Sequence, residues 1–510
     1  MCAPFGERGA MTSTVHSTSR PQVVLGLGLT AALLAVLTVI RLIGLKFSVV
    51  DLFFDEAQYW AWSRELAFGY FTKPPLLAWV IAVAESLCGS SEACVRAPAP
   101  ILYFGTCLLV YAIARQLYDE TVGFYAALST ALTPGVIFSA RIISTDVPLL
   151  FFWALALLAY AKLIDGGDRR WSAVLGVAIG LGMLAKYAMI YFLIGVALAA
   201  WLERDARQLL RRSDIWLALA LAALIILPNI HWNLTHELAT FRHTGDNIQG
   251  SGFKINPLRA LEFVATQFGV FGPILFAVLL GALARLASPA LGRADRLMLA
   301  FAIPPLALIT ATSIVSRAFA NWAATAYISG VVVVVALMIR HGAWRWLMLS
   351  LALGVLAQAA ALVSDARATK LNLPGLGDAY RRTLGWSILG SEAGRLARQV
   401  GARAIVGDQR DDVASLLYYW RDQPEPVLAW AAGASPTHQF ELTRAFSDAA
   451  PLPVLFVSRC PGTARLTAQF ASVESLGVFY TATGPTSKRA YNAYKLEHPR
   501  GPIGPLGPCG

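Results

Sequence analysis

Two adjacent carboxylates and a conformationally restricted lysine stand in residues 46–97, a long segment between apolar stretches. Asp55 and Glu56 begin a segment rich in tyrosine and tryptophan, and Lys73 comes directly before Pro74-Pro75. A carboxylate can accept the proton of an attacking hydroxyl, and an ammonium on a stiffened backbone suits an anionic headgroup. The alternatives are helix-capping acids and a snorkelling lysine. Together these residues predict a reaction site at a membrane surface.

Further ionisable groups interrupt apolar stretches later in the sequence. Arg141 and Asp146 flank a short polar turn, and Lys186-Tyr187 separates two apolar runs. Ionisable side chains at membrane depth are costly, so they indicate function unless a simpler role accounts for them. For Asp146 the simpler role is the N-terminal charge of its own helix. For Arg317, which lies in a short turn, it is an anchor at the membrane interface.

Two histidines in the polar segment 229–262 are candidates for binding a metal. His236 and His243 are seven residues apart, so they share one face if this segment is helical. A zinc or other divalent site is one hypothesis. Solvated loop histidines are the alternative that the sequence favours, because no tight ligand motif surrounds them.

The composition places these groups in a membrane protein. Of the 510 residues, 56% are hydrophobic and 14% are charged, and the mean hydropathy is +0.57. These values predict a polytopic α-helical membrane protein surrounded by membrane lipids. The net charge of +11 does not indicate nucleic-acid binding, because the arginines gather in short loops between apolar spans and set the topology there.

About eleven apolar stretches are long enough, or nearly long enough, to cross a bilayer, and we expect about 11 to 13 transmembrane helices. They run approximately over residues 23–45, 98–115, 121–138, 147–164, 171–186, 188–202, 214–230, 264–284, 297–314, 323–340 and 343–363. No small-residue cleavage pattern follows the first stretch. This favours an uncleaved anchor with residues 1–22 in the cytoplasm.

The basic loops fix the orientation of these spans. Arginine-rich loops stay in the cytoplasm. Residues 171–202 lie between two such loops, so they must cross the membrane twice, with a turn at Lys186. Residues 76–88 are too short, at about 20 Å of helix, to span comfortably and predict a juxtamembrane helix. The loop 46–97, the turn at Lys186 and everything from residue 364 onward then share the non-cytoplasmic side.

The chain changes character at about residue 364. Residues 402–408 and 452–457 are short runs rich in β-formers, and residues 411–421 have a helical pattern. They predict that residues 364–510 form a soluble α/β domain, large enough to bury its own core. The Gly- and Pro-rich end, residues 501–510, predicts a flexible tail.

Two of the six cysteines predict a disulfide. Cys88 and Cys94 flank a short polar turn in the loop assigned to the oxidising side, and five intervening residues are enough to close a disulfide loop. Cys460 and Cys509 are a second, weaker pair. Free buried thiols are the alternative for both pairs.

The ordered motifs resemble those of bacterial glycosyltransferases that use polyprenyl-phosphate sugars. These integral-membrane enzymes have the GT-C fold and are related to protein O-mannosyltransferases and to the lipid A aminoarabinose transferase. The resemblance covers about residues 23–363, and its first motif is also similar to that of rhizobial lipopolysaccharide galacturonosyltransferases. The motifs are 54–60 around Asp55-Glu56, Lys73-Pro74-Pro75-Leu76, Ser144-Thr145-Asp146, Leu184-Ala185-Lys186-Tyr187 and 317–322 from Arg317 to Asn321-Trp322.

The resemblance implies an activity and a place for it. Such enzymes transfer a sugar, with inversion, from an undecaprenyl-type phosphate to an envelope acceptor such as lipid A or the lipopolysaccharide core. The active site and the C-terminal domain would face the periplasm from the bacterial inner membrane. Asp55 would be the general base, and Glu56, its catalytic neighbour, would orient the acceptor or join a metal site.

The resemblance also implies roles for the remaining candidates. Lys73, Lys186 and Arg317 would bind the donor phosphate and offset its developing charge. Some relatives carry a metal near the active site, so a divalent ion is a candidate cofactor. The residues expected to orient the acceptor or the site are Asp146, Arg141, Tyr59 and Tyr187.

Two alternatives to this function remain open at the level of sequence. A protein acceptor would make the enzyme resemble protein O-mannosyltransferases in substrate as well as in fold. A lipid or solute transporter, or a flippase, would also need many spans, but it predicts ionisable residues near span centres and paired repeats. The charges of this chain concentrate instead at one face, which favours the enzyme.

Overall fold

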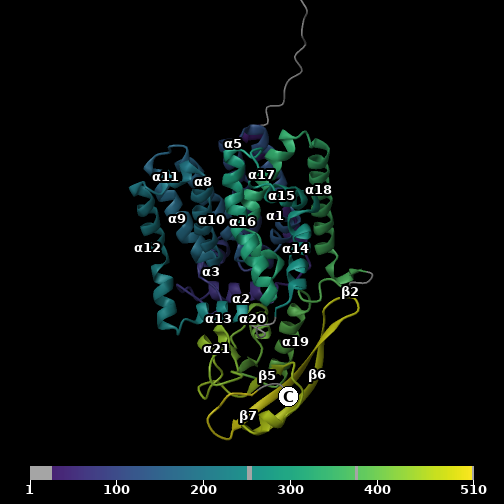
Figure 1. Ribbon diagram of the computed structural model, residues 1–510. Coiled ribbons are helices and arrows are strands. Elements are labelled where there is room, and N and C mark those ends of the chain that lie inside the picture. The colour runs from purple at the N-terminus through teal and green to yellow at the C-terminus, as the bar shows by residue number, and fades with distance from the viewer. Residues whose placement is uncertain (1–25, 250–254, 374–376, 508–510) are drawn as a thin grey trace, which may run out of the picture.

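The computed structural model describes the chain over residues 26–249, 255–373 and 377–507. It consists of a helical bundle, residues 27–366, and a C-terminal α/β unit, residues 377–507 (Figure 1). The bundle helices stand side by side, and the α/β unit lies against one end of them. The N-terminal segment predicted to be cytoplasmic, residues 1–22, lies outside the described residues.

Six helices of the described chain are long and apolar enough to cross a membrane. They are α1 (Leu27–Phe47), α5 (Pro98–Leu117), α8 (Asp146–Ile164), α12 (Ser213–Thr235), α16 (Arg293–Val315) and α18 (Trp344–Ala366). Four shorter apolar helices accompany them, and these are α3 (Leu76–Cys88), α10 (Ile190–Leu202), α15 (Pro273–Leu283) and α17 (Ala326–Arg340). Helix α17 is buried from Ala326 to Met338, as expected of a helix that is apolar on all sides.

Two of the predicted spans are not single helices. The stretch 121–138 is divided into α6 (Glu120–Ala131) and α7 (Pro134–Ser139), because a proline cannot continue the hydrogen-bond ladder of the preceding turn. The stretch 264–284 is divided at Gly272-Pro273, where Gly272 has φ +94°. The prediction of one straight span was wrong for both.

The remaining elements of the bundle include α9, which packs along α8 and α12, and several shorter helices. Helix α2 begins with the first-loop acids, and all its residues from Glu56 to Ser63 are buried. Helices α9 and α10 meet at Lys186, so the predicted turn is present. The remaining elements are α2 (Phe54–Ser63), α4 (Glu92–Arg96), α9 (Arg169–Ala185), η1 (Tyr187–Met189), α11 (Arg204–Leu209), α13 (Ala239–Gln249), α14 (Pro257–Phe271), η2 (Ala320–Ala323) and η3 (Ala368–Lys370).

The C-terminal α/β unit is built on a five-stranded sheet of order β4-β3-β5-β7-β6. Strand β3 is parallel to β4 and β5, whereas β5, β7 and β6 pair antiparallel. A two-stranded ribbon, β1-β2, follows the bundle. The strands are β1 (Asn372–Leu373), β2 (Gly377–Asp378), β3 (Ala404–Gly407), β4 (Val427–Ala429), β5 (Val454–Ser458), β6 (Phe470–Ala482) and β7 (Lys488–Pro499). The helices are α19 (Trp386–Gln399), α20 (Arg410–Tyr419), α21 (Gln439–Thr443) and α22 (Ala464–Thr467).

Sequence pattern located the first elements of this unit and misjudged its end. The runs predicted at 402–408 and 452–457 are strands β3 and β5, and the predicted helix at 411–421 is α20. The end, residues 501–510, was expected to be a flexible tail, and residues 508–510 lie outside the described part of the chain. Instead Leu506 is buried, its backbone N–H donates to Ala431 O, and Gly504 O accepts from Trp430 Nε1. An apolar leucine among the prolines and glycines is what anchors this segment.

Candidate active site

Glu56 is enclosed inside the first loop rather than open to a substrate. Its two oxygens accept from Arg96 Nε at 2.9 Å and from Arg96 Nη2 at 2.6 Å. They also accept from the backbone N–H groups of Phe53, at 2.9 Å, and Ile143, at 2.8 Å. The bond from Phe53 caps the first turn of α2, and the bond from Ile143 ties α2 to the turn before α8. Glu56 therefore fixes the position of its neighbour Asp55.

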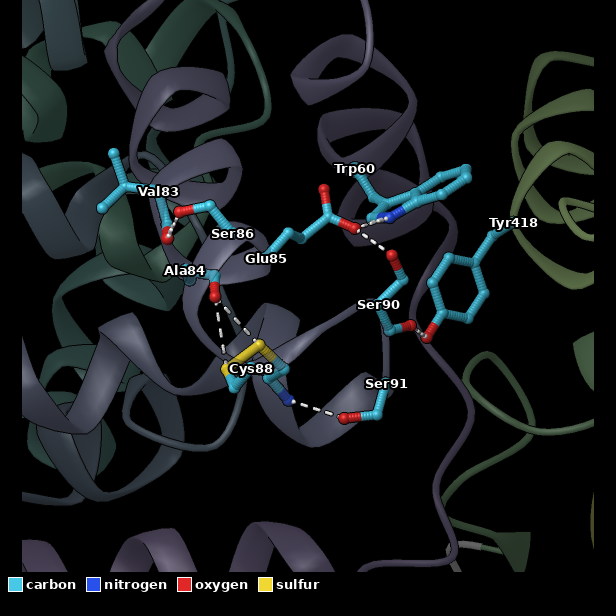
Figure 2. Close-up of a disulfide and its surroundings, with 10 residues drawn as sticks. Trp60, Val83, Ala84, Glu85, Ser86, Cys88, Ser90, Ser91 and Tyr418 are labelled. Carbon is cyan, nitrogen blue, oxygen red and sulfur yellow. Dashed lines mark hydrogen bonds between the residues drawn. A yellow bond between two sulfur atoms is a disulfide. The ribbon is translucent and has the colours of Figure 1, made fainter.

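The far end of α2 is braced by a second buried carboxylate, Glu85 of α3 (Figure 2). Glu85 Oε1 accepts from Trp60 Nε1 and from Ser90 Oγ, both at 2.5 Å. Tyr418 of the α/β unit donates to Ser90 O at 2.7 Å. The loop carrying Ser90 is closed by the disulfide that joins Cys88 and Cys94, as the sequence predicted. The second pairing, with Cys509, lies outside the described residues.

Asp55 faces the α/β unit. Its Oδ1 accepts from Arg410 Nη1, the first residue of α20, at 2.9 Å, and the same nitrogen lies 2.9 Å from Gln58 Oε1. Asp55 and Arg410 are each about one-third exposed, so the pair is reachable by a ligand. Tyr59 is buried beside them, and burial, together with the charge of Asp55, raises its pKa.

Lys73 lies within electrostatic range of Asp55 and forms no ion pair with any described residue. Among the described residues its ammonium has no hydrogen-bond or ion-pair partner. Burial and the nearby Lys186 lower the pKa of Lys73 to about 8, while the charges of Asp55 and Asp146 raise it. An unpaired ammonium in a partly desolvated site attracts an anion strongly.

Asp146 and Lys186 form the second charged pair of the site. Lys186 Nζ donates to Asp146 Oδ1 at 2.6 Å, and Asn321 Nδ2 of η2 donates to Asp146 Oδ2 at 2.6 Å. Asp146 is thereby engaged on both oxygens. Arg317, four residues before Asn321, is exposed in the segment leading to η2 and has no side-chain partner among the described residues.

Tyr187 connects the turn after α9 to the end of α12. Its hydroxyl donates to Asn229 Oδ1 at 2.7 Å, and Asn229 Nδ2 donates to Phe68 O of the first loop at 2.7 Å. The loop passes so close that a Cβ on Gly69 would lie 2.4 Å from the Trp232 ring. Only glycine fits there, so the loop carrying Lys73 is held tightly against α12.

Arg141 lies apart from this cluster. Its Nη1 donates to Asp365 Oδ1, at the end of α18, at 2.6 Å, and it also contacts the Tyr380 hydroxyl. The role predicted for Arg141 at the site is not supported by any contact with Asp55, Lys73 or their partners. Arg141 instead joins the bundle to the beginning of the α/β unit.

The two candidate metal ligands make separate contacts. His236 stacks on Trp232, with its Nδ1 2.8 Å from Trp232 O, and His243 lies against the Phe71 ring. No group of three or more metal-ligating side chains occurs within the described ranges. Glu56 and Asp146, the carboxylates proposed for a metal site, are already occupied by protein donors.

A cavity of about 390 Å³ opens beside the far end of α2. Its walls include the aromatic residues Trp62, Tyr70 and Trp232 and the polar residues Gln439 and Arg444. Gln439 Oε1 also accepts from Phe71 N at 2.8 Å, so the cavity borders the loop that carries Lys73. Its volume lies in the range of small-molecule sites.

Comparison with known proteins shows the family to which the chain belongs. Residues 72–232 match the family described as dolichyl-phosphate-mannose-protein mannosyltransferase. Over 407 residues the chain is 38% identical to the lipid A galacturonosyltransferase RgtD of Rhizobium johnstonii, which covers 79% of this chain and 85% of that protein. The chain belongs to the RgtD family of membrane glycosyltransferases. It is therefore an enzyme, and the transporter alternative no longer applies.

More distant relatives show how far the RgtD-family fold extends. The chain is 30% identical, over 33% of its length and 32% of the relative, to the undecaprenyl phosphate-alpha-4-amino-4-deoxy-L-arabinose arabinosyl transferase of Pseudomonas aeruginosa. ArnT from Cupriavidus metallidurans, solved bound to undecaprenyl phosphate, superimposes with a TM-score of 0.66 at 15% identity, over 92% of this chain and 98% of that one. The architecture is the polytopic helical GT-C fold.

Proposed function

We propose that this glycosyltransferase moves a sugar from a polyprenyl phosphate to a hydroxyl of lipid A or of the lipopolysaccharide core. One observation carries the proposal: Lys73, whose ammonium is unpaired among the described residues, lies within electrostatic range of the accessible carboxylate of Asp55. A cation for a lipid phosphate and a base for a hydroxyl are the two groups that this reaction needs at one place.

In the proposed step Asp55 accepts the proton of the acceptor hydroxyl as its oxygen attacks the anomeric carbon of the donor sugar. The new glycosidic C–O bond forms while the bond from the anomeric carbon to the phosphate oxygen breaks, and that electron pair leaves with the polyprenyl phosphate. Attack opposite the leaving group inverts the anomeric centre. Asp55 ends protonated and returns its proton to solvent.

The cations have distinct parts in this step. Lys73 binds the donor phosphate and offsets the negative charge that develops on it. Lys186 is already paired with Asp146, so it contributes positive potential and holds the turn rather than giving up its partner. Arg317, exposed and unpaired within the described residues, is a further ligand for the lipid phosphate.

Three of the candidate residues position other parts of the site and do not touch the substrate. They are Glu56, Tyr59 and Tyr187. Glu56 has all four of its hydrogen bonds inside the protein, and Tyr187 is committed to Asn229. We propose that they hold α2 and the Lys73 loop in register. The acceptor sugar enters through the aromatic cavity beside α2, where Trp62 and Tyr70 stack at 4.5 Å.

The names of the relatives support this choice of substrates. One is a lipid A galacturonosyltransferase, another acts with an undecaprenyl phosphate sugar, and the structural neighbour binds undecaprenyl phosphate. We place the site on the periplasmic side of the inner membrane. The arginine-rich loops prefer the cytoplasm, so the opposite face of the bundle, which carries the site, would face the periplasm. No step of the proposal requires a metal.

The direct test is to incubate the purified enzyme with radiolabelled polyprenyl-phosphate sugars and with lipid A or lipopolysaccharide core. Label moving into the glycolipid is the expected result. Label appearing in exported proteins and not in glycolipid would favour the protein O-mannosyltransferase-like alternative. No transfer to either acceptor from any donor would overturn the proposal.

A further inference from the structure

Arg410 belongs to the α/β unit but reaches the first loop of the bundle. It is the first residue of α20, and its Nη1 donates to both Asp55 Oδ1 and Gln58 Oε1. The guanidinium carbon lies 5.1 Å from the centroid of the Phe54 ring. The plane and position of the arginine are therefore set by three residues of α2.

One edge of this guanidinium is unused. Arginine has five N–H donors, and those of Nη1 meet Asp55 and Gln58. Among the described residues, Nε and Nη2 have no hydrogen-bond partner, and neither is one of the enclosed polar atoms of the protein. The Nε–Nη2 edge presents two parallel donors, the geometry that binds a carboxylate with two hydrogen bonds.

The position of Arg410 indicates which part of the substrate it meets. In an inverting transfer the base stands on the side of the attacking hydroxyl, and the phosphate leaves on the opposite side of the anomeric carbon. Arg410 touches the base, Asp55, whereas Lys73 is the unpaired cation available to the phosphate. In the proposed step this places Arg410 on the attacking side of the sugar ring, away from the lipid phosphate.

We propose that Arg410 is the residue that determines donor specificity, because its free Nε–Nη2 edge binds the carboxylate of a hexuronic acid with two hydrogen bonds. This inference rests on the proposed function. A sugar carboxylate close to Asp55 would repel it, and a guanidinium between the two carboxylates removes that repulsion. Two relatives from Rhizobium johnstonii, RgtD and RgtA, are named galacturonosyltransferases, which is consistent with an acidic sugar.

The experiment compares two donors that differ only at C6, galacturonosyl and galactosyl polyprenyl phosphate, with the same lipid A acceptor. For the wild-type enzyme we expect kcat/KM to be at least about tenfold higher with the uronosyl donor. Arg410→Gln should lower kcat/KM for the uronosyl donor about 10- to 100-fold further than for the galactosyl donor, since charge-assisted bonds are lost. Arg395→Gln, an exposed arginine of α19, is the matched control.

Arg410→Lys separates recognition from the positioning of Asp55. Lysine keeps the positive charge beside Asp55 but lacks the fork, so this variant should retain transfer of galactose and lose most of the preference for galacturonate. Thermal unfolding of each variant identifies any that does not fold. If Arg410→Gln does not fold, the ratio of kcat/KM for the uronosyl donor to that for the galactosyl donor in Arg410→Lys tests the inference instead.

Several outcomes would overturn the inference while leaving the proposed function intact. One is a wild-type enzyme that uses the galactosyl donor as well as the uronosyl donor. Another is an equal loss on both donors in Arg410→Gln, which would reduce Arg410 to a positioning residue for Asp55. A third is a loss of activity in Arg410→Gln that disappears when the acceptor is dephosphorylated. This result would mean that the Nε–Nη2 edge of Arg410 binds a phosphate of the acceptor. Failure of the wild-type enzyme with every donor would instead count against the proposed function.

Discussion

Glu56 Oε2 lies 2.6 Å from Arg96 Nη2, and both side chains are almost completely buried. The neighbouring carboxylate, Asp55, is about one-third exposed. Two adjacent acids of the same helix thus have opposite environments. Glu56 is buried in structural hydrogen bonds, whereas Asp55 is accessible to a substrate. Substitution of Glu56 should therefore affect stability, and substitution of Asp55 should affect activity.

Glu56→Gln should destabilise the protein, because it leaves the Arg96 guanidinium buried without a counter-ion. We expect a loss of about 3–5 kcal/mol in the free energy of unfolding. Thermal unfolding in detergent measures it. Glu120→Gln, which removes an exposed partner of Arg115, is the control and should change stability little. A Glu56→Gln protein that is as stable as wild type but inactive would return Glu56 to a catalytic role.

Asp55→Asn should leave folding close to normal and reduce transfer strongly. An asparagine keeps the shape and can still face Arg410, but it cannot take a proton. The expected loss in kcat is about 10²–10⁴-fold, the usual contribution of a general base. Turnover of labelled donor measures it, with Glu392→Gln on the exposed face of α19 as control. Near-wild-type turnover would eliminate Asp55 as the base.

Lys73 should give the reaction a pH limit. Because burial lowers the pKa of Lys73 to about 8, its ammonium is charged below that pH and loses its charge as the pH rises through it. Donor kcat/KM, which reports the free enzyme, should therefore fall above about pH 8. Lys73→Arg should move this limit to higher pH, and Lys73→Ala should raise donor KM and remove the limit. An unchanged profile in Lys73→Arg contradicts the assignment.

The Asp146–Lys186 pair should act as one unit. Asp146→Asn and Lys186→Met each leave a partner uncompensated, so the double variant should lose less stability than the sum of the two. The coupling expected for contacting residues is about 0.5–3 kcal/mol. A double-mutant cycle of unfolding free energies measures it. Strict additivity would mean that the 2.6 Å contact is not formed in the protein.

The proposed orientation can be tested with an impermeant maleimide on cysteines that are introduced one at a time, in a background in which Cys2 and Cys107 are replaced by serine. Probes at the exposed positions Arg64 and Asp422 should label in intact cells with permeabilised outer membranes, and a probe at Arg204 should label only after lysis. Labelling at Arg204 with protection at Arg64 would invert the topology. Protection at Asp422 alone would mean that one span has been miscounted.

Local signals in the sequence were enough to single out part of the candidate site. Asp55 and Lys73 stood out because charge is rare next to apolar spans, and Lys186 marked a turn because it interrupted a run that had to cross twice. The breaks at Pro134 and at Gly272-Pro273 were missed, because hydropathy counts length and ignores the backbone. The proline at each position, together with Gly272 at the second, is a helix-breaking signal that would have shown the break.

The partners of the acids could not be predicted in the same way. Arg410 is one of many arginines, lies in an ordinary amphipathic helix and is 355 residues from Asp55 in the chain. Arg96 reads as one more basic residue near a span. Nothing local distinguishes either from a solvated arginine, and only the packing of α20 on α2 brings Arg410 to the site. Arg141 is the opposite case, because it was conspicuous in the sequence and the structure pairs it with Asp365, a carboxylate distant in the chain.

The contact between Asp55 and Arg410 also sets when the proposed site can be complete during synthesis. Ribosomes add about 5–20 residues per second, so Asp55 leaves the ribosome roughly 20–70 seconds before the arginine that meets it. Throughout that interval the nascent chain is already threading its spans into the bilayer. A chain that stops before residue 410 would have its carboxylate and its lysine but no guanidinium opposite them. Competence is thus acquired only near the end of synthesis.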